Sequence, residues 1–174
     1  MRMTQILAAS VCALLLTAGV TRAETKVELK NVHLCCGACL KAVGGILKKE
    51  GVKGKCDQKA KTVTITAADD KAAQKAVDAL AAAGFHGDTG KKEVAVKDDS
   101  GVKAGKVKSL TLEGAHNCCG MCCKAIKATV KKVKGVEKDD AKPKAKSFTV
   151  TGDFDAAELV KALNEAGFHV KVKE

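Results

Sequence analysis

The residues with the clearest chemistry are cysteines in two short, similar stretches. Residues 33–39 read His-Leu-Cys-Cys-Gly-Ala-Cys and residues 116–123 read His-Asn-Cys-Cys-Gly-Met-Cys-Cys, and together they hold seven of the nine cysteines. Each stretch contains a Cys-x-x-Cys unit, Cys36 with Cys39 and Cys119 with Cys122. This spacing lets two sulfurs bind one ion at about 2.3 Å. Paired thiolates favour soft ions, so the units predict a site for Cu(I), Hg(II), Zn(II) or Cd(II), with Cu(I) as the first choice.

One further cysteine directly precedes each unit, Cys35 in the first stretch and Cys118 in the second. As a third ligand, it would favour three-coordinate Cu(I) or a tetrahedral zinc or cadmium site. The alternative is a thiol that points away from its neighbour. We therefore treat Cys35 and Cys118 as auxiliary ligands, and the sequence leaves the two orientations open.

Each cysteine stretch lies between an expected strand and an expected helix. Before the first, Val27 and Leu29 alternate with polar residues, as in a half-buried strand. After it, Leu40, Val43 and Leu47 fall on one face of a helix. The thiols are thus expected at a helix N-terminus, where the dipole favours thiolate over thiol.

The chain is an internal repeat with an offset of 83 residues. The stretch Ala-Gly-Phe-His occurs at residues 83–86 and again at 166–169, and all four histidines fall at matching positions. Such repetition predicts two copies of one structural unit. We expect a first domain at residues 24–97, a linker at 98–105 that contains two glycines, and a second domain at 106–174.

Each copy has the pattern strand, helix, strand, strand, helix, strand. In the first copy, residues 62–66 form a β-branched strand, a helix begins at Asp69 or Asp70 and stops at Gly84, and a last strand begins at Phe85. In the second copy, Val133 is expected to line the first helix. The pattern predicts an α+β protein of two ferredoxin-like βαββαβ domains in tandem, each an antiparallel four-stranded sheet covered by two helices. That topology would bring the cysteine loop and the Gly-Phe-His corner to one end of each domain.

Both copies resemble heavy-metal-associated domains, the fold of copper chaperones, periplasmic mercury-binding proteins and the N-terminal modules of metal-pumping ATPases. The family motif is Met-x-Cys-x-x-Cys between the first strand and the first helix, and its two metal ligands match Cys36 and Cys39, and Cys119 and Cys122. In place of the family's Gly-Met, this chain has His-Leu at 33–34 and His-Asn at 116–117. The resemblance also implies that Phe85 and Phe168 are the corner residues near the metal.

The remaining histidines and cysteines have weaker assignments. His86 and His169 follow the corner residue and could act as auxiliary ligands, because imidazole binds Zn(II) and Cu(II) well. His33 and His116 precede the thiols, and for all four the alternative is a surface or hydrogen-bonded side chain. Cys123 takes the position of Leu40 on the apolar helix face and is expected to be buried in the core. Cys56 is expected to be a free or auxiliary thiol.

The first 23 residues predict a signal peptide. A positive start is followed by an apolar run, and Thr-Arg-Ala at 21–23 offers a cleavage site before Glu24. The alternatives are an uncleaved anchor or a lipid-bearing Cys12. We expect a periplasmic or secreted protein without stable membrane insertion after cleavage.

Composition narrows the function classes. The net charge of +11 could favour nucleic acid, but export and the absence of Trp and Tyr from the sequence argue against it. No catalytic set of residues is visible, so we expect a monomeric metal-binding protein, not an enzyme, with a metal donor or acceptor protein as its partner. Two alternatives stay open: a thiol-disulfide redox protein of the cell envelope, and a small secreted fold stapled by four disulfides.

Overall fold

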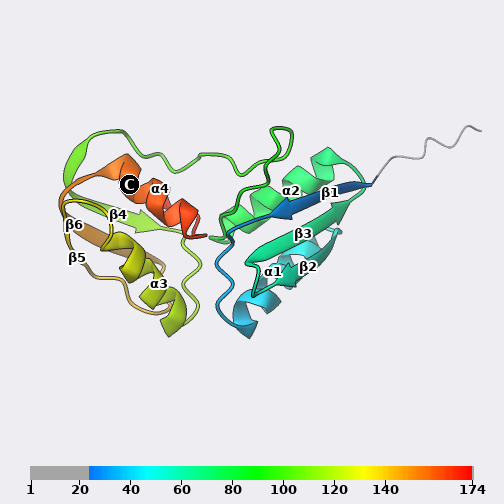
Figure 1. Cartoon of the computed structure of the whole chain (residues 1–174), viewed down its shortest axis with the longest axis horizontal. Helices are drawn as coiled ribbons and strands as arrows, with labels where there is room; N and C mark the ends of the chain where they lie inside the picture. Colours follow the sequence, from blue (N-terminus) through cyan, green and yellow to red (C-terminus); the bar gives the residue numbers. More distant parts are fainter. Residues whose placement is uncertain (1–23, 174) are drawn as a thin grey trace, which may run out of the picture.

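The structure, a computed structural model, describes residues 24–173 (Figure 1). The predicted signal peptide at residues 1–23, with Cys12, lies outside the described residues. Within the described part of the chain, no helix is long and apolar enough to cross a membrane.

The first half forms a small antiparallel sheet with two helices. Its elements are β1 (Thr25–Leu29), α1 (Gly37–Lys49), β2 (Lys53–Asp57), β3 (Thr62–Ala67) and α2 (Asp70–Ala82). The strand order is β1-β3-β2. Alternate residues of β3 are buried, Val63, Ile65 and Ala67. The helices bury one face each against them, so the apolar spacing read from the sequence becomes the core.

The second half repeats this plan with a fourth strand. Its elements are β4 (Lys106–Glu113), α3 (Gly120–Val130), β5 (Val136–Asp139), β6 (Ser147–Asp155), α4 (Ala156–Glu165) and β7 (Lys171–Val172). The strand order β5-β6-β4-β7 is the ferredoxin-like arrangement, in which the last strand joins the free edge of the first. Two antiparallel sheets with two helices each confirm the predicted fold class.

Two details of the prediction are wrong. The first sheet has three strands, because the strand expected from Phe85 is reduced to a single bridge between Lys30 and Asp88. The Asp88 carboxylate accepts a hydrogen bond from the Gly90 N–H at 2.8 Å and turns the chain away from the sheet. In the second half, α3 ends at Val130, so the buried Val133 lies in the turn that follows the helix.

The helices begin in two different ways. The N-cap residues of α2 and α4 are aspartates, Asp69 and Asp155, whose carboxylates accept hydrogen bonds from the first amides of the helix. The N-cap residues of α1 and α3 are Cys36 and Cys119, and neither side chain makes a capping hydrogen bond within the described residues. An N-cap hydrogen bond contributes about 1 kcal/mol. The two helices at the cysteine stretches lack that contribution.

The two halves pack against each other through matching segments. Phe85 and Phe168 form an antiparallel bridge, and both are fully buried. The His86 N–H donates to the Gly167 carbonyl at 3.1 Å, and the His169 N–H donates to the Gly84 carbonyl at 3.0 Å. Because equivalent residues of the two halves exchange equivalent bonds, the contact has the character of a two-fold symmetric interface. Figure 1 shows the chain segments that lead into α1 and α3 on the facing sides of the halves.

Candidate metal centre

Six cysteine sulfurs, three from each half, form one cluster where the halves meet. Within the halves, the Sγ atoms of Cys36 and Cys39 are 3.9 Å apart, and those of Cys119 and Cys122 are 3.8 Å apart. Between the halves, Cys36 and Cys119 are 4.0 Å apart. The predicted ligand pairs of the two repeats therefore lie in a single site.

Cys35 and Cys118 point into this cluster. The Sγ of Cys35 lies 3.6 Å from that of Cys39 and 3.3 Å from that of Cys122 in the other half. Cys118 is placed alike, 3.6 Å from Cys122 and 3.8 Å from Cys39. The sequence left the orientation of these two thiols open, and the structure turns both inward.

The cluster lies at the N-termini of α1 and α3. Cys36 and Cys119 are the N-cap residues with extended backbone, φ −157° and −152°, and Cys39 and Cys122 lie in the first helical turn. With no carboxylate cap in the way, the positive end of each helix dipole and its first N–H groups face the sulfurs. This environment favours thiolates, the form that binds metal.

The thiols of the cluster differ in pKa. The nearby backbone N–H groups at the start of α3, first that of Cys122, lower the pKa of Cys119 to about 6. Burial, followed by hydrogen bonds with neighbouring thiols, raises the pKa of Cys35 and that of Cys118. Burial also raises the pKa of Cys122. A metal ion that binds all of them must therefore displace protons, because the ligand form of cysteine is the thiolate.

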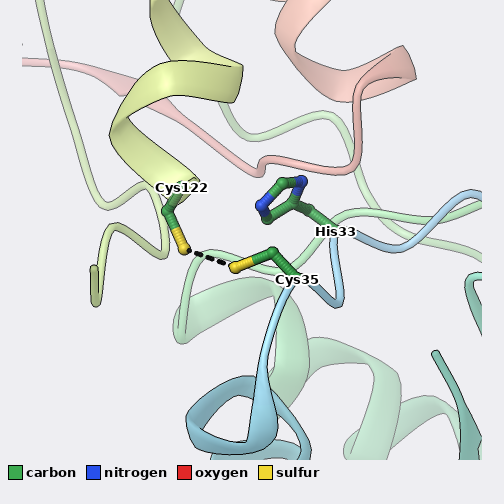
Figure 2. A group of neighbouring side chains, drawn as sticks. All are labelled: His33, Cys35 and Cys122. Atoms are coloured by element: carbon green, nitrogen blue, oxygen red, sulfur yellow. Dashed lines mark hydrogen bonds between the residues drawn. The ribbon is translucent and has the colours of Figure 1, made fainter. Parts of the chain in front are cut away.

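His33 is a further ligand candidate, which the sequence analysis did not place among the expected ligands. One of its ring nitrogens lies within 4.8 Å of the sulfurs of Cys35 and Cys122, which are themselves 3.3 Å apart (Figure 2). Its Nε2 atom is buried and has no hydrogen-bond partner among residues 24–173. Burial, with a smaller effect of His116, lowers the pKa of His33 to about 4, which keeps the ring neutral and able to bind a metal. The sequence feature that could have identified His33 as a ligand is its position two residues before Cys35, which His116 repeats before Cys118.

His86 and His169, the predicted auxiliary ligands, lie against each other. Their Nδ1 atoms are 3.2 Å apart, and the Nε2 of His169 lies 2.7 Å from the Asp99 carboxylate. If His169 donates to Asp99, its Nδ1 accepts from the Nδ1–H of His86. No group of potential metal ligands found in the described chain contains either ring. The structure thus gives this pair a place in the contact between the halves.

Cys56 and Cys123 stay outside the cluster. Cys123 is 5% exposed, and its thiol donates to the Ala141 carbonyl at 3.4 Å, in agreement with the core position expected for it. Cys56 is half-buried on β2, and burial raises the pKa of its thiol. All eight cysteines between residues 24 and 173 are free thiols.

Comparison with known proteins identifies part of the chain. Residues 112–169 match the heavy-metal-associated domain family. This match runs from the end of β4 through both helices to the Gly-Phe-His corner, and it contains the second cysteine stretch. No curated protein sequence matches the chain.

Three solved structures are similar to parts of the chain. Oxidized MerP from Ralstonia metallidurans is 30% identical, and the match covers 38% of this chain and 97% of that one with a TM-score of 0.36. A copper-binding domain from HMA7, a P-type ATPase, is 17% identical, with 39% and 96% covered and a TM-score of 0.37. The N-terminal soluble domains of Bacillus subtilis CopA are 17% identical, with 87% and 95% covered and a TM-score of 0.32.

Proposed function

Residues 112–169 form a heavy-metal-associated domain, and from this premise we propose that the whole chain binds soft metal ions and transfers or sequesters them. The observation that carries the proposal is the cluster of six sulfurs, with neighbouring atoms 3.3–4.0 Å apart. Sulfur ligands at this spacing select thiophilic ions over Mg²⁺ or Ca²⁺, which prefer oxygen ligands. The proposed role is binding and transfer, not catalysis.

Cu(I) is the ion that we propose first. A metal–sulfur bond of about 2.3 Å places three sulfurs of a trigonal site about 4 Å apart. The observed separations of 3.3–4.0 Å suit this geometry. A linear two-coordinate ion, the arrangement that suits Hg(II) with two thiolates, needs its sulfurs about 4.6 Å apart for the same bond length.

The proposed partner is a protein that donates or accepts the ion. Met121 lies in the first turn of α3, between the two cysteines of the second Cys-x-x-Cys unit, and its large apolar side chain is 52% exposed. A thioether is a soft ligand, so it could receive an ion at the rim of the cluster. The excess of lysine gives the chain a net charge of +11, which favours a partner with an acidic face.

We propose that this takes place outside the cytoplasm, in the periplasm or after secretion. The support is the charged start, the apolar run and the cleavage pattern of residues 1–23. N-terminal sequencing of the exported protein should begin at Glu24. Recovery of the protein from the cytosol with Met1 intact would contradict the proposal.

Competition with a Cu(I) chelator that becomes coloured when it binds copper tests metal binding directly. The reduced chain should withdraw Cu(I) from the chelator, and the bound copper should appear in metal analysis after gel filtration. A matched chain with Cys36, Cys39, Cys119 and Cys122 all changed to Ser should leave the copper with the chelator. Equal retention by both chains would overturn the assignment of the ligands.

One observation favours a second function, thiol-disulfide exchange. The lowered pKa of Cys119, about 6, provides a thiolate at neutral pH, and a thiolate is the attacking species in exchange. Thiols titrated on freshly isolated protein distinguish the two functions. A metal-binding protein should show free or metal-protected thiols, whereas a redox protein should show a reversible disulfide within Cys-x-x-Cys.

A further inference from the structure

We propose that the two repeats share one site, in which six thiolates and His33 hold a cluster of up to four Cu(I) ions. This inference rests on the proposed function and deepens it. Its alternative is one ion in each Cys-x-x-Cys unit, with the two units acting separately.

The first step is that the cysteine stretches are not separate in space. The shortest distance between two of the sulfurs joins the halves, 3.3 Å between Cys35 and Cys122. The distance between Cys35 and Cys119 is 3.7 Å, whereas the pair within one Cys-x-x-Cys unit, Cys36 and Cys39, is 3.9 Å apart. Cys35 is therefore as close to sulfurs of the other half as the two cysteines of one Cys-x-x-Cys unit are to each other.

The second step is that the potential ligands form four triangles, each of a size that fits one trigonal ion. The ligand atoms of each group lie within 4.8 Å of one another. The groups are His33, Cys35 and Cys122; Cys35, Cys36 and Cys119; Cys36, Cys39 and Cys118; and Cys118, Cys119 and Cys122.

The third step is that the triangles share corners. Five of the six sulfurs belong to two groups each, and only Cys39 and His33 belong to one. A thiolate has lone pairs for two soft cations and can bridge them. Ions at the four triangles would therefore be linked by bridging thiolates into one cluster, and no ligand would need to bind more than two ions.

Charge also favours several ions over one. Six thiolates at 3.3–4.0 Å repel one another strongly in a partly buried site. One Cu(I) would leave five negative charges uncompensated or require several thiols to keep their protons. Four Cu(I) ions would leave two, so each ion added beyond the first reduces the repulsion.

Packing outside the sulfur cluster also joins the two halves. His33 stacks on Phe168 with ring centroids 4.3 Å apart, and His116 stacks on Phe85 at 4.1 Å. At Gly84, φ is +85° and an added Cβ would lie 2.2 Å from the carbonyl oxygen of Gly114 in the other half. This packing helps to hold the ligands of the two halves together, which lowers the cost of forming the cluster.

Titration of the full, reduced chain with Cu(I) alone tests the inference. Native mass spectrometry should show the metal-free chain converting to a four-copper form, with little of the intermediate forms. X-ray absorption should show copper–copper scattering and a first shell of sulfur. Two copper ions per chain without copper–copper scattering would overturn the shared cluster and leave the proposed function intact. Failure to bind Cu(I) at all would overturn both.

A pair of glycine variants tests whether the contact between the halves is required. Gly84→Ala introduces the clash with the other half, whereas Gly51→Ala has a similar positive φ of +70° after α1 and no atom within 4 Å of the added Cβ. Both variants carry similar backbone strain, so circular dichroism should show similar folding. Gly84→Ala should lose the four-copper form and retain at most two ions, and Gly51→Ala should keep four. The inference would be overturned if a folded Gly84→Ala chain, with its halves separated, still bound four ions and showed copper–copper scattering.

Discussion

The two halves of the molecule are alike at the thiols and unlike at the residues that support them. The separations of Cys35 from Cys39 and of Cys118 from Cys122 are both 3.6 Å. One position before these thiols, the first half has the buried Leu34 and the second has Asn117, a buried amide that donates to the Lys142 carbonyl at 2.7 Å. The arrangement of sulfurs is preserved although the packing beneath it has changed.

The supporting hydrogen bonds also differ between the halves. In the first, the Gln58 side chain donates to the Cys35 carbonyl at 3.0 Å. In the second, the Lys144 backbone N–H donates to the Asn117 carbonyl at 2.8 Å. Both bonds tie a cysteine loop to the turn between two strands. The same sulfur separations are therefore held by different supporting hydrogen bonds in the two halves.

The largest expected effect comes from the metal ligands themselves. Cys36→Ser and Cys119→Ser should each lower Cu(I) affinity by orders of magnitude, because each removes a sulfur that belongs to both a Cys-x-x-Cys pair and the contact between the halves. Competition with a Cu(I) chelator measures the loss. Equal losses of affinity in the two variants would show that the two halves contribute equally to metal binding.

Cys123→Ser is the matched control for this comparison. Its thiol is buried on the apolar face of α3 and donates to a backbone carbonyl, outside the cluster. We expect lower stability with little change in affinity. A loss of affinity as large as that of Cys119→Ser would show that Cys123 acts on the metal.

The next largest effect concerns the two corner phenylalanines. Phe85→Ala and Phe168→Ala should each lower the free energy of unfolding by about 3–5 kcal/mol. Both should also weaken Cu(I) binding, because each ring packs on a histidine of the other half. Phe148→Ala, in the buried face of β6, should cost similar stability with a smaller loss of affinity. Denaturant unfolding and chelator competition on all three variants would separate packing between the halves from packing within one.

A smaller effect is expected from exchanging the supports. Leu34→Asn buries an amide where the first half has an apolar side chain, and it should destabilise the chain by about 1–3 kcal/mol. Asn117→Leu removes an amide whose Oδ1 has no hydrogen-bond partner within residues 24–173. The Lys142 carbonyl loses one hydrogen bond and keeps the one from the Ala145 N–H at 3.1 Å. We therefore expect a cost of about 1 kcal/mol or less for Asn117→Leu. Chemical denaturation of the two variants measures both losses of unfolding free energy. Equal losses would contradict the expected order and show that both halves tolerate the same supports.

The smallest effect is the pH dependence of the histidine pair. Burial, followed by the neighbouring His169, lowers the pKa of His86 from 6.5 to about 4, against the opposing effects of Asp88 and Asp98. Because the folded pKa lies below the unfolded one, the stabilisation is present above pH 6.5 and is lost as the pH falls towards 4. The Asp99 carboxylate that binds His169 should stay ionised over most of this range.

His86→Gln should flatten this part of the pH profile. The free energy of unfolding of the original chain, measured at intervals between pH 7 and pH 4, should fall more steeply than that of the variant. Parallel profiles would place the acid sensitivity elsewhere, for example at His33, whose pKa is also lowered to about 4.

The sequence by itself determined the repeat, the fold class and the two Cys-x-x-Cys pairs as the centre of the molecule. These follow from local information. Alternation in β3 and three- and four-residue spacing in α1 depend only on neighbours in the chain. The identical offset of both motifs requires no knowledge of how the halves pack.

Only the tertiary structure decided that the two cysteine stretches form one cluster. The backbone bonds at the centre of the contact between the halves involve residues 84–86 and 167–169, short corner segments without a periodic pattern. It also decided that His33, not His86 or His169, lies beside the thiols. Such contacts depend on shape and on the close approach allowed by Gly84 and Gly167. The repeated Ala-Gly-Phe-His stretch marks these positions along the chain, but it does not show that they meet in space.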